Sequence, residues 1–121
     1  MPLTTIATTF SDSNENLREN LAHIKEFAET IKAIKHTQIR RYFHEVKSIT
    51  YEEIFMLEPK LLYGIGRIKS SAEDAAIKTA MKTFLLALVE IVEAINSKKK
   101  LKNFKKFMET LVAYHKFYSE N

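Results

Sequence analysis

Arginine and lysine side chains carry the clearest chemistry in this sequence, because both bind phosphate oxygens and other anions. Arg40, His44 and Lys47 recur at steps of four and three, so they share one face of a predicted helix, with Arg41 beside them. This face is either a solvated basic surface or a surface that contacts phosphate. The guanidinium of arginine favours the second interpretation, because its fork of donors matches phosphate oxygens.

A second basic group follows two glycines. Arg67 and Lys69 lie directly after Gly64 and Gly66, which are the only glycines in the chain. Glycine has no side chain, so another chain or a phosphate can approach the backbone closely there. The same residues also fit the end of a helix, with cations placed to interact with the helix dipole. The sequence supports these two interpretations about equally.

The largest concentration of positive charge is in residues 97–118, where six of nine consecutive positions are lysine: Lys98, Lys99, Lys100, Lys102, Lys105 and Lys106. The net charge of +4 is unevenly distributed along the chain. Counting charged residues gives −1 for 1–36, +2 for 37–69, −2 for 70–96 and +5 for 97–121. This distribution indicates a local anion-binding surface rather than nonspecific binding over the whole protein.

No catalytic constellation accompanies this charge. The chain has four histidines, none paired at helical spacing with another, and no cysteine to complete a zinc site. It has no glycine-rich phosphate loop and no serine flanked by glycines. We therefore expect a binding protein and not an enzyme, with no metal and no cofactor.

Several features predict a cytoplasmic protein without a membrane segment. Absence of cysteine fits a reducing compartment. Residues 1–10 have neither a basic start nor an apolar run, so they do not resemble a signal peptide. The longest apolar run, residues 84–95, contains Glu90 and Glu93 and is too short and too charged to span a bilayer.

The elements that position these side chains are predicted to be helices, because the chain has only two glycines and two prolines. We predict an all-α fold, a compact bundle of about five helices, in which residues 1–11 form a flexible N-terminal arm and 12–121 a single helical domain. Apolar spacing places the helices at about 12–35, 38–47, 51–69, 72–96 and 97–118.

Local signals refine these limits. Capping boxes are predicted at Asp12 with Glu15 and at Thr50 with Glu53. Pro59 predicts a kink or a break just before it. The helix over 72–96 is apolar around more than half its circumference, so we expect it to be the most buried element, with the others packed around it.

Three segments resemble one protein family: HTQIRRYFHEV at 36–46, LEPKLLYGIGR at 57–67 and FKKFMETLVAYHKFY at 104–118. In order and spacing they are similar to the Csm small subunit, the all-helical repeated subunit of type III-A CRISPR–Cas interference complexes. The resemblance covers about residues 36–118, and its last segment is the most specific. Residues 1–35 match only as a generic first helix.

The resemblance implies a non-catalytic subunit of an antiviral complex. Several copies of such a subunit stack along the duplex of crRNA and target RNA. They lie between a Cas10-type large subunit and the backbone subunits that hold the crRNA. Basic residues would contact the RNA backbone, whereas base pairing reads the sequence. Together with the basic faces above, this predicts an RNA-binding set of Arg40, Arg41, Lys47, Lys60, Arg67, Lys69, Lys105 and Lys106.

A rival interpretation is a helical protein-interaction module without nucleic-acid binding, whose lysines serve solubility. A third interpretation, a small helical enzyme, is disfavoured because the sequence contains no recognisable group of catalytic residues. Salt-dependent retention of RNA distinguishes the first two, because phosphate binding weakens with salt.

The junction at Asn96–Ser97 leads to a prediction about assembly. It contains no glycine or proline, so the last two helices can join into one helix running from Ala72 to Tyr118. The apolar side of residues 97–118 would then pack into the helical bundle of another copy. We therefore predict a homodimer for the isolated protein, with helix exchange as one route to it. The monomer would be the form that stacks in the complex.

Overall fold

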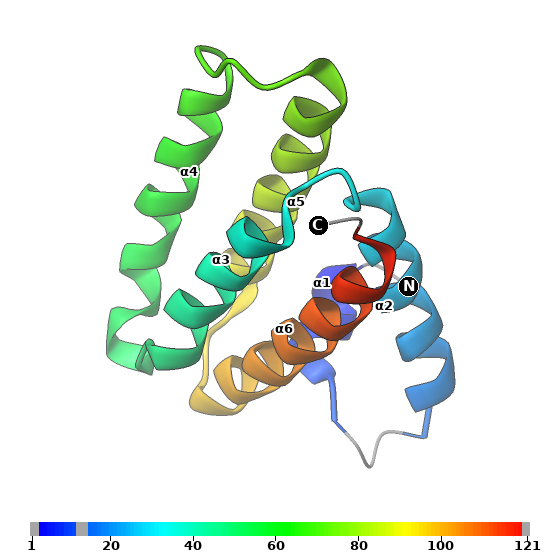
Figure 1. Ribbon diagram of the computed structural model, residues 1–121. Helices are drawn as coiled ribbons and strands as arrows, with labels where there is room; N and C mark the ends of the chain where they lie inside the picture. The colour runs from blue at the N-terminus through cyan, green and yellow to red at the C-terminus, as the bar shows by residue number, and fades with distance from the viewer. Residues whose placement is uncertain (1–2, 12–14, 120–121) are drawn as a thin grey trace.

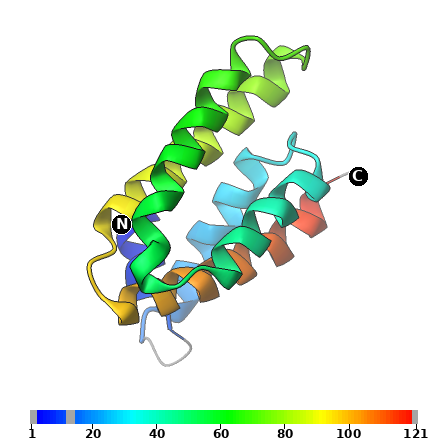
Figure 2. The same ribbon diagram turned by 90° about the vertical axis from the view of Figure 1, so that its left-hand side faces the viewer.

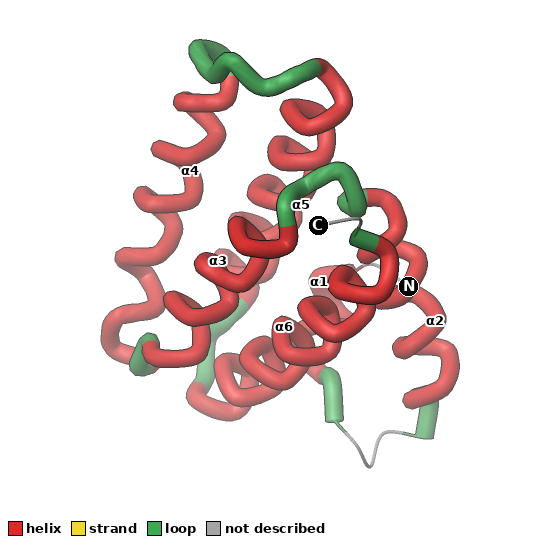
Figure 3. Tube along the Cα trace, viewed as in Figure 1, coloured by secondary structure: helices red, strands yellow, loops and turns green. Residues whose placement is uncertain are grey.

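The fold is all-α, as predicted. A computed structural model describes residues 3–11 and 15–119, and these contain six α-helices, one 3-10 helix and no strand. Figures 1 and 3 show the helices connected by short loops. In chain order they are α1 (Leu3–Thr9), α2 (Leu17–Thr30), α3 (His36–Ser48), η1 (Tyr51–Met56), α4 (Leu57–Ile68), α5 (Ala75–Ala94) and α6 (Lys98–Tyr118).

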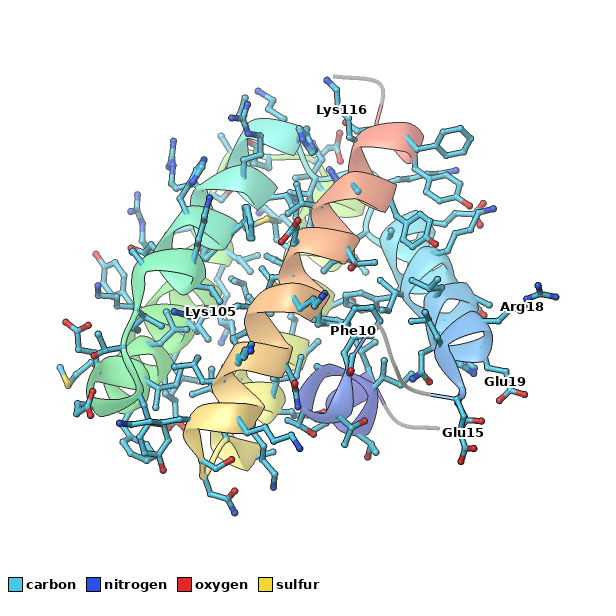
Figure 4. The ribbon with its side chains drawn as sticks, turned by 90° about the horizontal axis from the view of Figure 1, so that it is seen from below. Phe10, Glu15, Arg18, Glu19, Lys105 and Lys116 are labelled. Atoms are coloured by element: carbon cyan, nitrogen blue, oxygen red, sulfur yellow. The ribbon has the colours of Figure 1, made fainter. Side chains whose placement is uncertain are left out.

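Helix α6 is the centre of one half of the molecule, where it packs against α1, α2 and α3. Most of its apolar side is buried, as expected from the spacing of three and four residues, whereas Tyr114 and Tyr118 near its end are partly buried. Four of its apolar side chains are 0% exposed: Phe104, Phe107, Met108 and Leu111. The view in Figure 4 shows α6 lying between α3 on one side and α2 on the other.

Helices α4 and α5 form the other half, an antiparallel pair whose connected ends project beyond the rest of the molecule (Figure 2). The prediction that this second-last helix is the most buried holds only for part of it, because its burial begins at Ala80. The helix starts at Ala75, three residues later than expected. Its N-cap is Asp74, whose carboxylate accepts a hydrogen bond of 3.0 Å from the backbone N–H of Ile77.

The flexible arm predicted for residues 1–11 is wrong for residues 3–11, most of which form α1. Ile6, Ala7 and Phe10 are at most 2% exposed, because α1 packs against α5 and α6. The side-chain amide of Asn103, on α6, donates a 2.7 Å hydrogen bond to the carbonyl of Thr8. Figure 4 shows Phe10 between α6 and α2. Long-range packing therefore determines the structure of a segment whose own sequence shows no helical pattern.

The junction between α5 and α6 is a tight turn and not a continuous helix. Ile95 and Ser97 both have extended backbone angles, and no described residue has a positive φ. The hydroxyl of Ser97 accepts a 3.2 Å hydrogen bond from the N–H of Lys100, which starts the new helix. A reversal without glycine is therefore possible, and α6 packs within its own chain.

Two local predictions are confirmed. The Thr50 backbone N–H and hydroxyl donate to the Glu53 carboxylate at 3.0 and 2.9 Å, which closes the capping box and lowers the pKa of Glu53. Pro59 lies in the first turn of α4, directly after the change from 3-10 to α-helix. The proposed cap at Asp12 lies outside the described residues. No helix within 3–11 and 15–119 has the length and apolar content needed to cross a membrane.

Candidate nucleic-acid interface

Helix α3 carries the first basic face. Ile39 and Val46 anchor the helix in the core, which directs the opposite side of the helix to solvent. Arg40 and Arg41 are exposed on this outer side. The helix begins at His36, with Lys35 at the N-cap, so it starts two residues earlier than the predicted range of 38–47.

A shallow depression of about 540 Å³ runs along the outer side of α3. It is lined by Thr37, Arg40, Arg41, His44, Glu45 and Ser48. The structure thus brings Arg40, Arg41 and His44 onto one surface, as their helical spacing predicts. Lys47 is exposed on the same helix, but its ammonium lies over the ring of Phe43, 5.9 Å from the centroid.

A second depression, of about 430 Å³, lies between α3 and α4 and shares Arg41 and Glu45 with the first. Its other lining residues are Tyr42, Pro59, Lys60, Tyr63, Gly64 and Arg67. Two sequence segments predicted to be basic separately therefore meet at one surface. Arg40, Arg41, Lys60 and Arg67 together form what we call the α3–α4 basic face.

The cations of the α3–α4 basic face are weakly engaged inside the protein. Lys60 lies 3.9 Å from the carboxylate of Glu45, with both side chains largely exposed, so this pair is screened by solvent. Neither Arg40 nor Arg41 forms an ion pair within residues 3–11 and 15–119. The surface therefore has positive charge available for a ligand.

Close packing beneath this face depends on Gly64. A β-carbon added at Gly64 would lie 3.1 Å from the Tyr42 hydroxyl and 3.2 Å from Leu85 Cδ1, whereas one added at Gly66 would meet nothing within 4 Å. Gly64 thus lets α4 approach its neighbours. Burial and the nearby Glu45 carboxylate raise the pKa of Tyr42. Its ring packs edge-on against Phe84, which fixes the base of the depression.

Lys105 and Lys106 do not lie on the α3–α4 basic face. The Lys105 ammonium donates a 2.6 Å hydrogen bond to the carbonyl of Ile49, directly after α3, and Figure 4 shows this lysine on the side of α6 nearest α3. Lys105 therefore has a structural role. Lys106 lines a different depression, between the end of α1 and the start of α6. Lys69 is exposed beyond the end of α4.

Four more lysines gather at that other depression: Lys98, Lys99, Lys100 and Lys102. They lie in the first turns of α6, where the positive end of the helix dipole adds to their charge. The described residues therefore form two separate basic surfaces. Of the predicted RNA-binding set, four residues lie on the α3–α4 basic face and Lys106 lies on the other surface. The remaining three line neither surface: Lys47, Lys69 and Lys105.

A histidine pair missed by the sequence analysis lies close to the α3–α4 basic face. His36 Nδ1 is 2.9 Å from His115 Nδ1, and the two rings stack with centroids 5.2 Å apart. Burial lowers the pKa of both, and for His36 the neighbouring His115, Lys116 and Arg40 add to this effect. Backbone groups of Ile31 and Ile34 oppose part of the lowering at His115. The two residues are 79 positions apart, so no local pattern reveals the contact.

Tyr63 was also missed, although a signal was available. Pro59, Tyr63 and Arg67 are spaced by four, so they share one face of α4. The Arg67 guanidinium lies over the Tyr63 ring, 5.9 Å from its centroid. An aromatic ring is therefore part of the candidate interface.

Comparison with known proteins identifies the family. The family model for Csm2 Type III-A matches residues 14–121. No curated protein matches the chain, and no solved structure matches it. The match extends the resemblance carried by the three segments to almost the whole chain, including the first long helix. The chain belongs to the Csm2 family, the small subunit of the type III-A Csm complex.

Proposed function

We propose that this Csm2-family protein binds the backbone of the crRNA–target RNA duplex through the α3–α4 basic face, in the cytoplasm and without catalysing a reaction. The observation that carries the proposal is that Arg40, Arg41, Lys60 and Arg67 converge from two helices on one exposed surface. Such contacts depend on phosphate charge and not on sequence, as expected where base pairing selects the target.

Neighbouring subunits are the second class of partner in this proposal: further copies of the chain, a Cas10-type large subunit and the subunits that hold the crRNA. Support comes from large apolar side chains left exposed on several helices: Phe55, Met56, Leu62, Leu86 and Phe117. Where such groups adjoin, as Phe55 and Met56 do in the sequence, they are typical of surfaces that other proteins cover. The same observation favours the alternative function, a protein-interaction module that does not bind RNA.

Salt dependence distinguishes these two functions. If phosphates are the ligand, the logarithm of the affinity for a labelled RNA duplex should fall linearly with the logarithm of salt concentration. With about two to four phosphate contacts per copy, binding by the isolated protein should be weak at physiological salt. An affinity that does not change with salt would contradict the phosphate proposal.

Substitution then identifies the face. Changing Arg40, Arg41 and Arg67 to Ala should weaken duplex binding without loss of helicity, because exposed residues contribute little to stability. Lys105→Met is a matched control, since its ammonium is engaged with Ile49, and it should bind RNA as the unmodified protein does. If neutralising Lys98, Lys99 and Lys100 abolished binding while the arginine variant retained it, the interface would lie at the start of α6.

For the isolated protein we propose a homodimer, with the monomer as the form that stacks in the complex. The single chain already accommodates α6, so exchange would require the turn at residues 95–97 to open into a helix. Light scattering should give about twice the chain mass of 14.1 kDa. Inserting Gly-Gly after Asn96 should favour the monomer. A strictly monomeric protein at high concentration would refute the dimer.

A further inference from the structure

The depression between α3 and α4 contains an aromatic ring that the fold does not use. Tyr63 is 69% exposed, although its phenol ring is one of the larger apolar groups of the chain. It lines the depression together with three cations, Arg41, Lys60 and Arg67. Contact with the duplex backbone requires the cations only, so the exposed ring calls for a further ligand group.

The surroundings of Tyr63 hold the ring in place. The Arg67 guanidinium lies over it at 5.9 Å from the centroid, a cation–π contact that restricts the motion of both side chains. Pro59 lies one turn earlier on the same helix face and lines the same depression. A ring restrained in this way loses little freedom when a flat ligand stacks on it.

The charge of the depression fits a ligand with one or two negative charges. Arg41, Lys60 and Arg67 contribute three positive charges and Glu45 one negative charge, a net of two positive charges. Glu45 lies 3.9 Å from Lys60 and lines the side of the depression nearest that lysine. The volume of the depression, about 430 Å³, is within the range of small-molecule sites. A planar apolar surface beside cations is the combination that binds single nucleotides of an RNA strand.

We propose that this depression holds one unpaired nucleotide of RNA, with its base stacked on Tyr63 and its phosphate bound by Arg41 and Arg67. A duplex cannot supply such a base, because its bases are stacked on one another and lie in grooves that side chains reach poorly. The inference rests on the proposed function, since both use Arg41. It adds that this subunit contacts an RNA nucleotide through its base as well as its backbone.

The test compares a labelled 12-nucleotide single-stranded RNA with the duplex of the same sequence, by fluorescence anisotropy at several salt concentrations. Tyr63→Leu should weaken binding of the single strand about ten-fold, from the typical stacking energy of a base on an aromatic ring. The loss should be the same at every salt concentration, because stacking releases no counterions. Tyr63→Phe keeps the ring and should bind like the unmodified protein, and neither change should affect the duplex.

Phe55→Leu is the matched control, because Phe55 is a similarly exposed aromatic residue, 62% against 69% for Tyr63, that does not line the depression. It should leave single-strand binding unchanged. Arg41→Ala should instead lower the salt dependence by the equivalent of about one phosphate contact. Circular dichroism of each variant verifies that the helices remain, which is expected at positions this exposed.

A direct signal for stacking comes from a single-stranded RNA that carries 2-aminopurine, whose fluorescence decreases when the base stacks. The unmodified protein and Tyr63→Phe should quench it, and Tyr63→Leu should not. If Tyr63→Leu binds and quenches like the unmodified protein, the nucleotide site is refuted while the arginine face remains as a backbone contact. If the Arg40, Arg41 and Arg67 variant binds duplex normally, the proposed function itself fails.

Discussion

The core around α6 and the outer part of the α4–α5 hairpin are stabilised very differently. Around α6, residues of three other helices enclose aromatic and aliphatic side chains with no exposed surface. In the hairpin of α4 and α5, by contrast, none of the eighteen residues from 62 to 79 is buried. This second region contains both glycines, the exposed Tyr63 and Arg67 of the α3–α4 basic face.

This difference separates the stable core from the candidate interface. Local regions with few buried contacts open at lower free energy than the core around them. The basic face has one side on α3, which the α6 core holds firmly, and the other on α4, which is held mainly by α5 and by contact at Gly64. A ligand that contacts both sides would therefore order the hairpin more than it orders the core.

The largest expected effect is a loss of the α6 core. Phe104→Ala should lower the free energy of unfolding by about 3–5 kcal/mol, because it removes a fully buried ring and leaves a cavity. Chemical denaturation followed by circular dichroism measures this. Phe117→Ala, on the same helix but with a 77% exposed ring, should cost less than about 1 kcal/mol. Equal losses for the two variants would contradict the assignment of α6 as the central element.

The next effect concerns the histidine pair that joins α3 to α6. Burial holds the pKa of His36 and His115 below the ordinary value of 6.5, so the unfolded chain binds protons first as pH falls. The free energy of unfolding should therefore have its highest value above pH 6.5 and decrease as the pH falls below it. Denaturation curves between pH 5 and 7.5 measure this, in a range where most carboxylates stay ionised.

Replacing both members of the pair tests its origin. His36→Gln with His115→Gln should flatten the dependence of stability on pH in this range. The matched control replaces the exposed His23 and His44 by Gln, and it should retain the dependence. If the control removes the dependence and the buried pair does not, the buried contact is not its source.

The smallest effect compares the two glycines of α4. Gly66→Ala should stabilise the protein by about 0.5–1 kcal/mol, since alanine favours the helix and its β-carbon meets nothing within 4 Å. Gly64→Ala gains the same helix propensity but crowds Tyr42 and Leu85. It should therefore be less stable than Gly66→Ala by about 1 kcal/mol. Thermal unfolding of the pair measures the difference, and equal stabilisation would show that α4 is not closely packed at Gly64.

The sequence predicted the features that depend on near neighbours. The helical class, the buried stripe of α6 and the capping box at Thr50 follow from spacing over a few residues. The common face of Arg40 and Arg41 follows from the same rule. These signals survive in the structure because packing reinforced them.

Features formed by distant residues were not predictable in the same way. Helix α1 has four threonines among seven residues, which have low helix propensity. The hydrogen bond from Lys105 to Ile49 spans 56 positions. In the sequence, Lys105 therefore cannot be distinguished from the exposed lysines beside it. The turn at residues 95–97 is made by extended residues, whereas the absence of glycine there suggested that the last two helices could join into one. Whether the eight predicted cations bind RNA remains a prediction, and the structure brings four of them together.

The burial of α1 has a practical consequence for defining the domain. The family match begins at residue 14, whereas Ile6, Ala7 and Phe10 fill the apolar surface between α5 and α6. The homologous segment and the cooperative folding unit therefore have different boundaries. A chain truncated at the start of the match would leave an exposed apolar surface on α5 and α6, and such surfaces promote aggregation. Expression of this protein should therefore begin before Leu3.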